Sequence, residues 1–501
     1  MAQAQPVAMS TLLLATLLAL ALLTGRFWPA SPAPARLLIL GLPLPWVLWQ
    51  GQLLPALIYL LALLWETCRH PHQQTFTWLP ASDVRQDLAR TAAAAYDPRP
   101  LLDARRGWML GLDAGEPCYL PTPLAHLQVL GGSGCGKSAA LGVLAAQALA
   151  HGESVIYFDP KEDLWAASAL AAAAEHCGRR LHCLDLRPQA PAQFNLIDGC
   201  DTHQLYDLLL HGLDLLESGS DADFYRLADR QGARQLADAW RPGDTLATLT
   251  ARAIAPLRRK APALCLRLEE IAGIAAGQGV GGPRMSDLLA AGDACYILGS
   301  TRLDSVRRLQ RIVLLRLIQS AETRARPAER LCCIILDEFR YHLCRGSLDA
   351  LSTIRDRGVH LILAHQSLGD LAAGPGDLSA AAVAAAVNEN CALKLVFRLQ
   401  DPDTAEWLAR KSGQVPQQRQ QARYWPGLSD PVIEGSQEAA GTLISATTLL
   451  HLPERVAVLY GYGRARELVQ SAWPCVRREW QAITTPDSRC RPDLSRFEMN
   501  A

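Results

Sequence analysis

Runs of apolar residues recur along the chain from residue 126 onward, and stretches with helical spacing separate most of them. The runs are short and nearly continuous, which is typical of parallel strands buried on both faces of a sheet. The alternation of such strands with helices predicts an α/β fold built on a doubly wound parallel sheet. The predicted strands are residues 126–131, 154–159, 181–186, 294–299, 331–337, 359–365 and 391–398.

Residues 200–290 interrupt this alternation. They are rich in Ala, Leu and Arg with helical spacing and contain no convincing strand, so we expect an all-helical domain inserted between two strands of the sheet. Residues 414–430 are polar and rich in Gln, and we expect an exposed loop there. Two further short strands are predicted at residues 456–461 and 467–472.

Two uncharged apolar runs come before the first predicted strand, at residues 9–25 and 37–65. The second run has 29 residues, and as a helix it would extend about 43 Å, beyond the roughly 30 Å hydrocarbon core of a bilayer. Pro43, Pro45 and residues 50–52 interrupt it, so it forms one tilted helix, one helix with an interfacial lead-in, or a tight hairpin. The first ten residues contain no Lys or Arg, which argues against a cleaved signal peptide.

These patterns divide the chain into six parts. We expect a transmembrane anchor with about two spans, an approach segment, an α/β domain in two parts around the helical insertion, and a tail. The anchor is residues 1–66, the approach segment 67–125 and the tail 476–501. The α/β domain comprises residues 126–199 and 291–475, and the helical insertion comprises residues 200–290.

The 501 residues carry 49 basic and 49 acidic side chains, so the formal net charge is zero. This balance argues against a protein that coats nucleic acid by bulk attraction, although it leaves room for a local basic channel. The 14 cysteines are scattered without a CxxC pair, as expected of free thiols in a reducing compartment. Only five of the basic residues are lysines, at positions 137, 161, 260, 394 and 411. Each is a candidate for a role that a guanidinium cannot fill.

The strongest chemical signal is the segment GGSGCGKS, which matches the phosphate-binding loop G-x-x-x-x-G-K-[ST] between a strand and a helix. Its glycines allow backbone amides to surround phosphates at the helix N-terminus. Lys137 would reach the β- and γ-phosphates of ATP, and the Ser138 hydroxyl would coordinate Mg²⁺. The predicted nucleotide-binding residues are Gly131, Gly132, Ser133, Gly134, Cys135, Gly136, Lys137 and Ser138.

Hydrolysis requires a metal ligand and a base in addition to this loop. The apolar run at residues 331–336 ends in two acids, Asp337 and Glu338. Asp337 fits a Mg²⁺ ligand, and Glu338 fits the base that activates the attacking water. An acid pair at a strand end also caps helices in many proteins, but its place after a phosphate-binding loop favours the catalytic role.

Residues 354–367 (IRDRGVHLILAHQS) carry two further candidate catalytic residues. Gln366 lies at the carboxyl end of a predicted strand, the end of an α/β sheet that faces bound nucleotide. Arg355 precedes the same strand and is a candidate arginine finger into a neighbouring subunit. The alternative is that Arg355 or Arg357 is a solvated charge at a helix end.

Several of these segments occur together in one known family. The segments FDPK, FNLI, LDEF and KLVFRLQDPDTAEWLARKSG occur here in that order, at residues 158–161, 194–197, 336–339 and 394–413. With Arg355, Gly358 and Gln366 they resemble type IV secretion coupling proteins of the TraD/TraG type, within the FtsK/HerA-related P-loop superfamily. The resemblance covers roughly residues 100–475 and extends to the anchor, to His126 before the loop and to the helical insertion.

This resemblance implies a RecA-like P-loop ATPase that forms a homo-hexameric ring around a DNA channel. It also implies recruitment of a relaxase bound to single-stranded DNA to channel components in the bacterial inner membrane. Arg355 takes the position of the arginine finger and Gln366 that of a conserved glutamine. Lys161 falls in the family's DPK motif, and we expect a structural or nucleotide-linked role for it.

The chain also departs from the family. Cys135 occupies a loop position usually filled by Ser or another small polar residue. We expect it to preserve nucleotide binding but to make the ATPase sensitive to thiol reagents. Only a short tail follows the motor, without the long acidic extension that some relatives use for docking, so the docking surface for the relaxase stays open.

The leading hypothesis is a membrane-anchored ATPase that couples a relaxase–DNA substrate to a type IV secretion channel and drives its transfer. The alternatives are a substrate receptor for protein effectors of such a system and an FtsK/HerA-type DNA translocase. Because ATP is cytosolic, the motor must lie in the cytoplasm and the anchor in the inner membrane. Two spans place the loop at residues 26–36 outside, mildly against the positive-inside tendency, whereas a third span places it inside.

Overall fold

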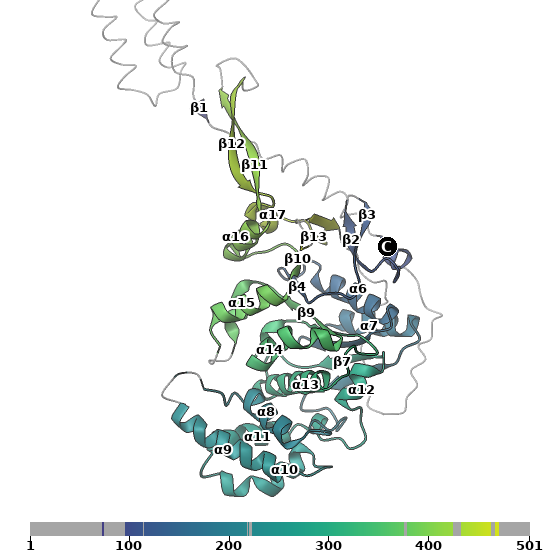
Figure 1. The fold of residues 1–501 in the computed structure, drawn as a ribbon, viewed down its shortest axis with the longest axis vertical. Coiled ribbons are helices and arrows are strands. Elements are labelled where there is room, and N and C mark those ends of the chain that lie inside the picture. Colours follow the sequence, from purple (N-terminus) through teal and green to yellow (C-terminus); the bar gives the residue numbers. More distant parts are fainter. Residues whose placement is uncertain are drawn as a thin grey trace, which may run out of the picture. The chain divides into compact units, whose positions relative to one another are not determined.

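The computed structural model describes residues 73–74, 96–461 and 466–469, apart from residues 114, 218, 220–222, 375–377 and 424–431. The predicted anchor and tail, residues 1–66 and 476–501, lie outside the described residues. Within the part that is described, no helix combines the length and apolar character needed to cross a bilayer. The chain divides into two compact units, one holding a large sheet and the other a small one (Figure 1).

Eleven strands of the described residues form the large sheet, in the order β3-β2-β14-β13-β10-β4-β9-β8-β5-β7-β6. Its central part is parallel, as the sequence predicts, and each predicted strand is present to within one or two residues at either end. The parallel strands are β4 (Leu127–Leu130), β5 (Ser154–Asp159), β6 (Leu181–Asp185), β7 (Ala294–Leu298), β8 (Cys332–Leu336), β9 (Val359–His365) and β10 (Leu393–Val396).

Antiparallel strands extend the sheet beyond β10, so the sheet is mixed. Two of them, β13 (Val456–Tyr460) and β14 (Arg466–Val469), correspond to the last two predicted strands. The other two, β2 (Trp108–Asp113) and β3 (Glu116–Leu120), form a hairpin within the approach segment. The sequence pattern did not predict this hairpin, because no helix flanks it to mark a strand–helix alternation.

Helices cover both faces of the parallel strands because successive strand residues point to opposite sides. Val155 of β5 packs in a core with α6 (Lys137–Ala150) and α7 (Leu164–His176). Its neighbour Ile156 packs in a second core with α13 (Asp304–Glu322), α14 (Arg345–Thr353) and α15 (Ala380–Asn390). A third, smaller core lies beside β10 and β13, under α16 (Pro402–Lys411) and α17 (Ala446–Leu450).

Residues 200–290 contain helices and no described strand of the sheet. The helices are α8 (Thr202–Gly212), α9 (Asp223–Ala239), α10 (Leu246–Ala253), α11 (Pro262–Ala272) and α12 (Met285–Ala290). Capping boxes begin α8 at Asp201 and α10 at Thr245, which satisfies amide groups at those helix ends. The helices share one continuous core with a face of the large sheet, in part through contact between α8 and α13 (Figure 1).

The small sheet has the order β1-β11-β12, from Gln73–Gln74, Gln414–Arg423 and Val432–Thr442. The predicted exposed loop at residues 414–430 is therefore wrong for its first part, which is strand β11. The segment QVPQQRQQAR shows no alternation of apolar and polar residues. Its main-chain groups pair with β1 and β12, and a search for periodicity does not detect such pairing.

Candidate nucleotide-binding and hydrolysis site

The predicted phosphate-binding loop connects the carboxyl end of β4 to the first residue of α6. Gly134 and Gly136 have left-handed backbone angles, with φ of 73° and 116°. At Gly131, a Cβ atom would lie 2.7 Å from Cβ of Phe397, so the loop tolerates no side chain there. The amide of Gly132 donates to the Arg398 carbonyl oxygen at 2.8 Å, which fixes the loop to the end of β10.

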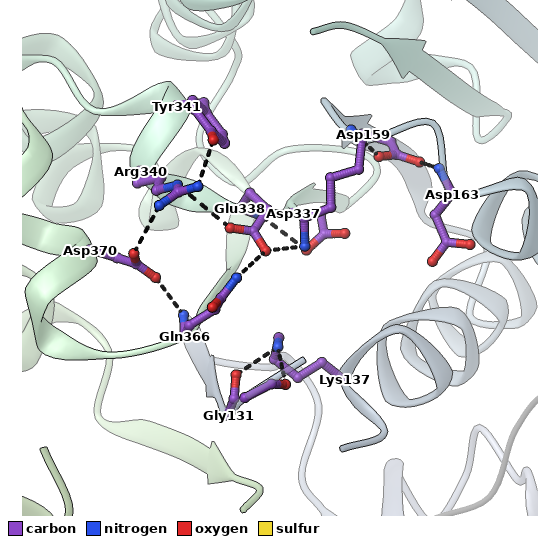
Figure 2. Close-up of polar contacts among 12 residues, drawn as sticks. Gly131, Lys137, Asp159, Asp163, Asp337, Glu338, Arg340, Tyr341, Gln366 and Asp370 are labelled. Carbon is purple, nitrogen blue, oxygen red and sulfur yellow. Dashed lines mark hydrogen bonds and ion pairs between the residues drawn. The ribbon is translucent and has the colours of Figure 1, made fainter. Parts of the chain in front are cut away.

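Lys137 lies over this loop. Its ammonium group donates hydrogen bonds to the carbonyl oxygens of Gly131, at 2.6 Å, and Gly132, at 2.7 Å (Figure 2). Burial lowers the pKa of Lys137, although nearby Glu338 and Asp337 favour its charged form. The loop thus holds a buried lysine on its own backbone, in the place that the sequence predicts for a phosphate ligand.

Cys135 is buried in the same loop. Its thiol donates to the Gly132 carbonyl oxygen at 2.9 Å, and burial raises its pKa above the usual value. A buried thiol that stays protonated is a poor nucleophile. The structure therefore argues against the expected sensitivity to thiol reagents.

Asp337 and Glu338 follow β8 at the same edge of the sheet as the loop, because β8 and β4 are both parallel to β9. Asp337 is almost fully buried, and burial raises its pKa to about 6 while the charge of Lys161 acts in the opposite direction. Its Oδ1 atom accepts a hydrogen bond from the Glu338 amide at 2.9 Å. Glu338 has a left-handed conformation, with φ 48°, which is costly for a residue with a side chain.

The Glu338 carboxylate is fully buried and lies among three donor groups (Figure 2). Its Oε1 atom forms an ion pair with the ammonium of Lys161 and accepts from Nε2 of Gln366 at 3.2 Å. The Arg340 Nε atom lies 3.8 Å from Oε2. Burial would raise the pKa of Glu338, but the hydrogen bond and charge of Lys161 outweigh it, and the pKa lies below its usual value. The group is therefore an ionised carboxylate, the form that a general base requires.

Gln366 lies just after the carboxyl end of β9, as predicted. The main-chain amide of Gln366 donates to Oδ2 of Asp370 at 2.7 Å, and the other oxygen of Asp370 lies 3.4 Å from a guanidinium nitrogen of Arg340. Arg340 also donates to the Tyr341 hydroxyl at 2.6 Å. Sequence reasoning did not single out Arg340, Asp370 or Tyr341, because only the folded chain brings η4 (Phe339–His342) and η6 (Leu368–Ala373) beside Gln366.

The turn after β5 carries Lys161. Oδ1 of Asp159 accepts from the Lys161 amide at 2.8 Å, and Oδ2 accepts from the Asp163 amide at 2.6 Å and from the Tyr296 hydroxyl. The DPK segment thus forms a fixed turn whose lysine forms an ion pair with Glu338.

Arg355 lies elsewhere. It begins a short 3-10 helix, η5 (Arg355–Arg357), which precedes β9, and its side chain is exposed. Gln366 follows the opposite end of β9, which is seven residues long. The structure therefore does not bring Arg355 to the loop of its own subunit.

The donor chemistry of these residues fits a Mg²⁺ ion. Asp337 is a buried carboxylate near two further acids, Asp159 and Glu338, whose charges raise its pKa. Ser138 lies in the first turn of α6. Carboxylate and hydroxyl oxygens are the ligands that a hard divalent cation prefers.

Comparison with known proteins places the chain beside conjugative coupling proteins. Residues 332–454 match a family model described as the TraM recognition site of TraD and TraG. Over 361 residues the chain is 31% identical to Mobilization protein A of Escherichia coli, a match that covers 63% of this chain. It spans 61% of that relative's length, less than two thirds.

Among solved structures, the fold resembles the bacterial conjugative coupling protein TrwB. A TrwBdeltaN70 structure with sulphate has a TM-score of 0.55 at 16% identity, covering 82% of this chain and 97% of that chain. A TrwB complex with ADP and Mg²⁺ has a TM-score of 0.53 at 16% identity, covering 81% and 96% of the two chains. At this identity the likeness shows a shared fold.

Proposed function

The chain belongs to the type IV coupling proteins of the TraD/TraG type, and we propose that it is a membrane-anchored ATPase that drives DNA transfer. Its substrate would be a relaxase bound to single-stranded DNA, handed to a type IV secretion channel. The working form would be a homo-hexamer in the bacterial inner membrane with the motor in the cytoplasm. The names of the relatives, a mobilization protein and a conjugative coupling protein, support DNA as the cargo.

One observation carries the ATPase proposal: an ionised, buried glutamate lies at the strand end beside the phosphate-binding loop. In this site Lys137 would leave the carbonyl oxygens of Gly131 and Gly132 for the β- and γ-phosphates. Glu338 would take a proton from water as the water oxygen bonds to the γ-phosphorus. The bond from that phosphorus to the β,γ-bridging oxygen then breaks, which yields ADP and phosphate. Ser138 and Asp337 would hold Mg²⁺, which neutralises phosphate charge when bound.

The proposal predicts ATP hydrolysis by the purified full-length chain in detergent, and its stimulation by single-stranded DNA. Lys137→Ala should remove hydrolysis yet still fractionate with membranes, because the loop is remote in sequence from the predicted anchor. Equal turnover by the wild type and Lys137→Ala would contradict the site assignment. If neither single- nor double-stranded DNA changes the rate of hydrolysis, the result would instead favour a receptor for protein substrates.

A further inference from the structure

Lys161 is a charged group beside the site that the hydrolytic scheme above does not use. It is one of five lysines in a chain whose other basic residues are all arginines. Its ammonium contacts the carboxylate of Glu338, which is fully buried. The contact therefore joins an unassigned motif residue to the proposed base.

The backbone around Lys161 is fixed independently of that contact. The side chain of Asp159 accepts hydrogen bonds from the amides of Lys161 and Asp163, and the Tyr296 hydroxyl on β7 holds Asp159 in turn. The next residue, Glu162, has φ 62°, so the turn is held in a costly conformation. The lysine is thus presented from β5 to its neighbour β8, where Phe158 pairs with Leu336 just before the two acids.

The two oxygens of Glu338 have different surroundings. Oε1 contacts both Lys161 and Nε2 of Gln366. Oε2 is buried and has no hydrogen-bond partner among the described residues, and Nε of Arg340 lies 3.8 Å from it. One oxygen is therefore held by the protein, and the other remains able to accept a proton from water.

We propose that Lys161 is a positioning residue for the hydrolytic base. It holds Oε1 of Glu338 so that Oε2 faces the attacking water, and it does not itself contact the phosphates. This inference rests on the proposed ATPase function. A lysine suits the task because an ammonium is a point charge, whereas the planar fork of an arginine would engage both carboxylate oxygens at once.

The test compares Lys161→Ala with the wild type and with Lys260→Ala, a matched change at an exposed lysine of the helical insertion. We expect Lys161→Ala to lower kcat by about 10- to 100-fold, a part of what a general base contributes. The dissociation constants of fluorescent ATP and ADP analogues should stay within about twofold, because the phosphates keep their ligands. Lys260→Ala should change neither quantity. If the alanine variant melts at a lower temperature, Lys161→Met, which keeps the apolar stem, replaces it.

A double-mutant cycle separates positioning from a general structural role. When Glu338→Ala has removed the carboxylate, adding Lys161→Ala should change the single-turnover rate by less than about twofold. Equal losses in both backgrounds would overturn the proposal. So would a selective loss of affinity for ATP over ADP, since it would place Lys161 on the γ-phosphate. If the wild type itself fails to hydrolyse ATP, the proposed function fails first, which distinguishes the two failures.

Discussion

Glu162, Glu338 and Arg455 are three of the four non-glycine residues with positive φ among those described, and all three belong to segments that build the candidate site. Arg455 donates its amide to the Cys135 carbonyl oxygen at 3.0 Å, directly behind the phosphate-binding loop. Such conformations each cost about 1–3 kcal/mol and persist where the surroundings over-determine them. Among the described residues, this kind of backbone strain is thus concentrated where nucleotide would be bound and hydrolysed.

Glu338→Gln should separate nucleotide binding from hydrolysis. The amide keeps the shape of the carboxylate and loses its basicity, so turnover should fall by about 10²- to 10⁴-fold. Retention of labelled ATP on a filter should stay close to the wild-type level. Asp349→Asn, an exposed acid on α14, is the matched control and should leave both measurements unchanged. Wild-type turnover in Glu338→Gln would remove this residue from the role of base.

Cys135 should resist alkylation in the native protein. Burial raises the pKa of both Cys135 and Cys177, but the Cys135 thiol is 1% exposed whereas Cys177 is only half-buried. Mass spectrometry after brief iodoacetamide treatment should find Cys177 modified well before Cys135, and ATPase activity should survive the treatment. Cys135→Ser should keep activity within about twofold, because a hydroxyl can make the same hydrogen bond to Gly132. Rapid modification of Cys135 with loss of activity would show that the loop opens to solvent.

At the scale of elements, helix α8 of the insertion packs closely against α13, which covers one face of the large sheet. A Cβ atom at Gly212 would lie 2.2 Å from Cγ1 of Ile312, so the contact requires glycine. Gly212→Val should destabilise the protein by about 1–3 kcal/mol through overpacking. Hydrogen exchange should quicken in α8 more than in β4 or β5. His203→Ala, at an exposed position of the same helix, should leave exchange unchanged. Uniform loosening of the whole chain would contradict a local role.

Histidines connect β4 and β9 at both ends of their pairing. His126 accepts from the Leu361 amide through Nδ1 at 2.8 Å, and a ring nitrogen of His365 lies 2.7 Å from Nε2 of Gln128. Burial lowers the pKa of each histidine to about 4. The unfolded chain, where a histidine titrates near 6.5, therefore binds more protons than the folded chain between these values. The free energy of unfolding should fall as pH decreases from about 6.5 to about 4.

His365→Gln tests this pH dependence, because the amide can still bond to Gln128 and does not titrate. The raised pKa of Asp337, about 6, works in the opposite direction in the wild type, so the comparison between variants matters more than either curve. In urea unfolding, the loss of free energy per pH unit should be smaller in His365→Gln by about 1.4 kcal/mol. The exposed His203→Gln should match the wild type. If the free energy of unfolding changes with pH equally in His365→Gln and in the wild type, His365 does not stay neutral in the folded protein.

The elements that the sequence predicted share a local signal, and those it missed do not. The buried parallel strands are apolar on both faces, and the phosphate-binding loop and the acids Asp337 and Glu338 follow directly from short motifs. Strand β11 lacks such a signal because its pairing is made by main-chain groups. Likewise, the contacts of Glu338 with Lys161 and of Arg340 with Asp370 join residues far apart in the chain. They depend on how turns at neighbouring strand ends are oriented, which no local pattern records.

At the scale of the whole molecule, the position of Arg355 bears on assembly. Arg355 precedes β9 and the loop follows β4, a strand parallel to β9. The two are therefore at opposite edges of the sheet, separated along a seven-residue strand by about 20 Å at the usual rise per residue. A role in its own subunit's site is excluded by this distance, whereas a finger into the next subunit of a ring is compatible with an exposed arginine at that edge.

Mixed assemblies can test the finger directly. Arg355→Ala alone should lose about 10³-fold in turnover while binding ATP normally, because a finger stabilises charge only in the transition state. Lys137→Ala subunits should not hydrolyse ATP but should still supply Arg355, so mixing the two variants should restore turnover with a maximum at intermediate ratios. Arg357→Ala is the matched control, since its guanidinium donates to the Arg324 carbonyl oxygen within the subunit; it should retain turnover and need no partner. If Arg355→Ala alone keeps full turnover, Arg355 is a solvated charge at the helix end. If turnover does not recover at any mixing ratio, each site is completed within a single subunit.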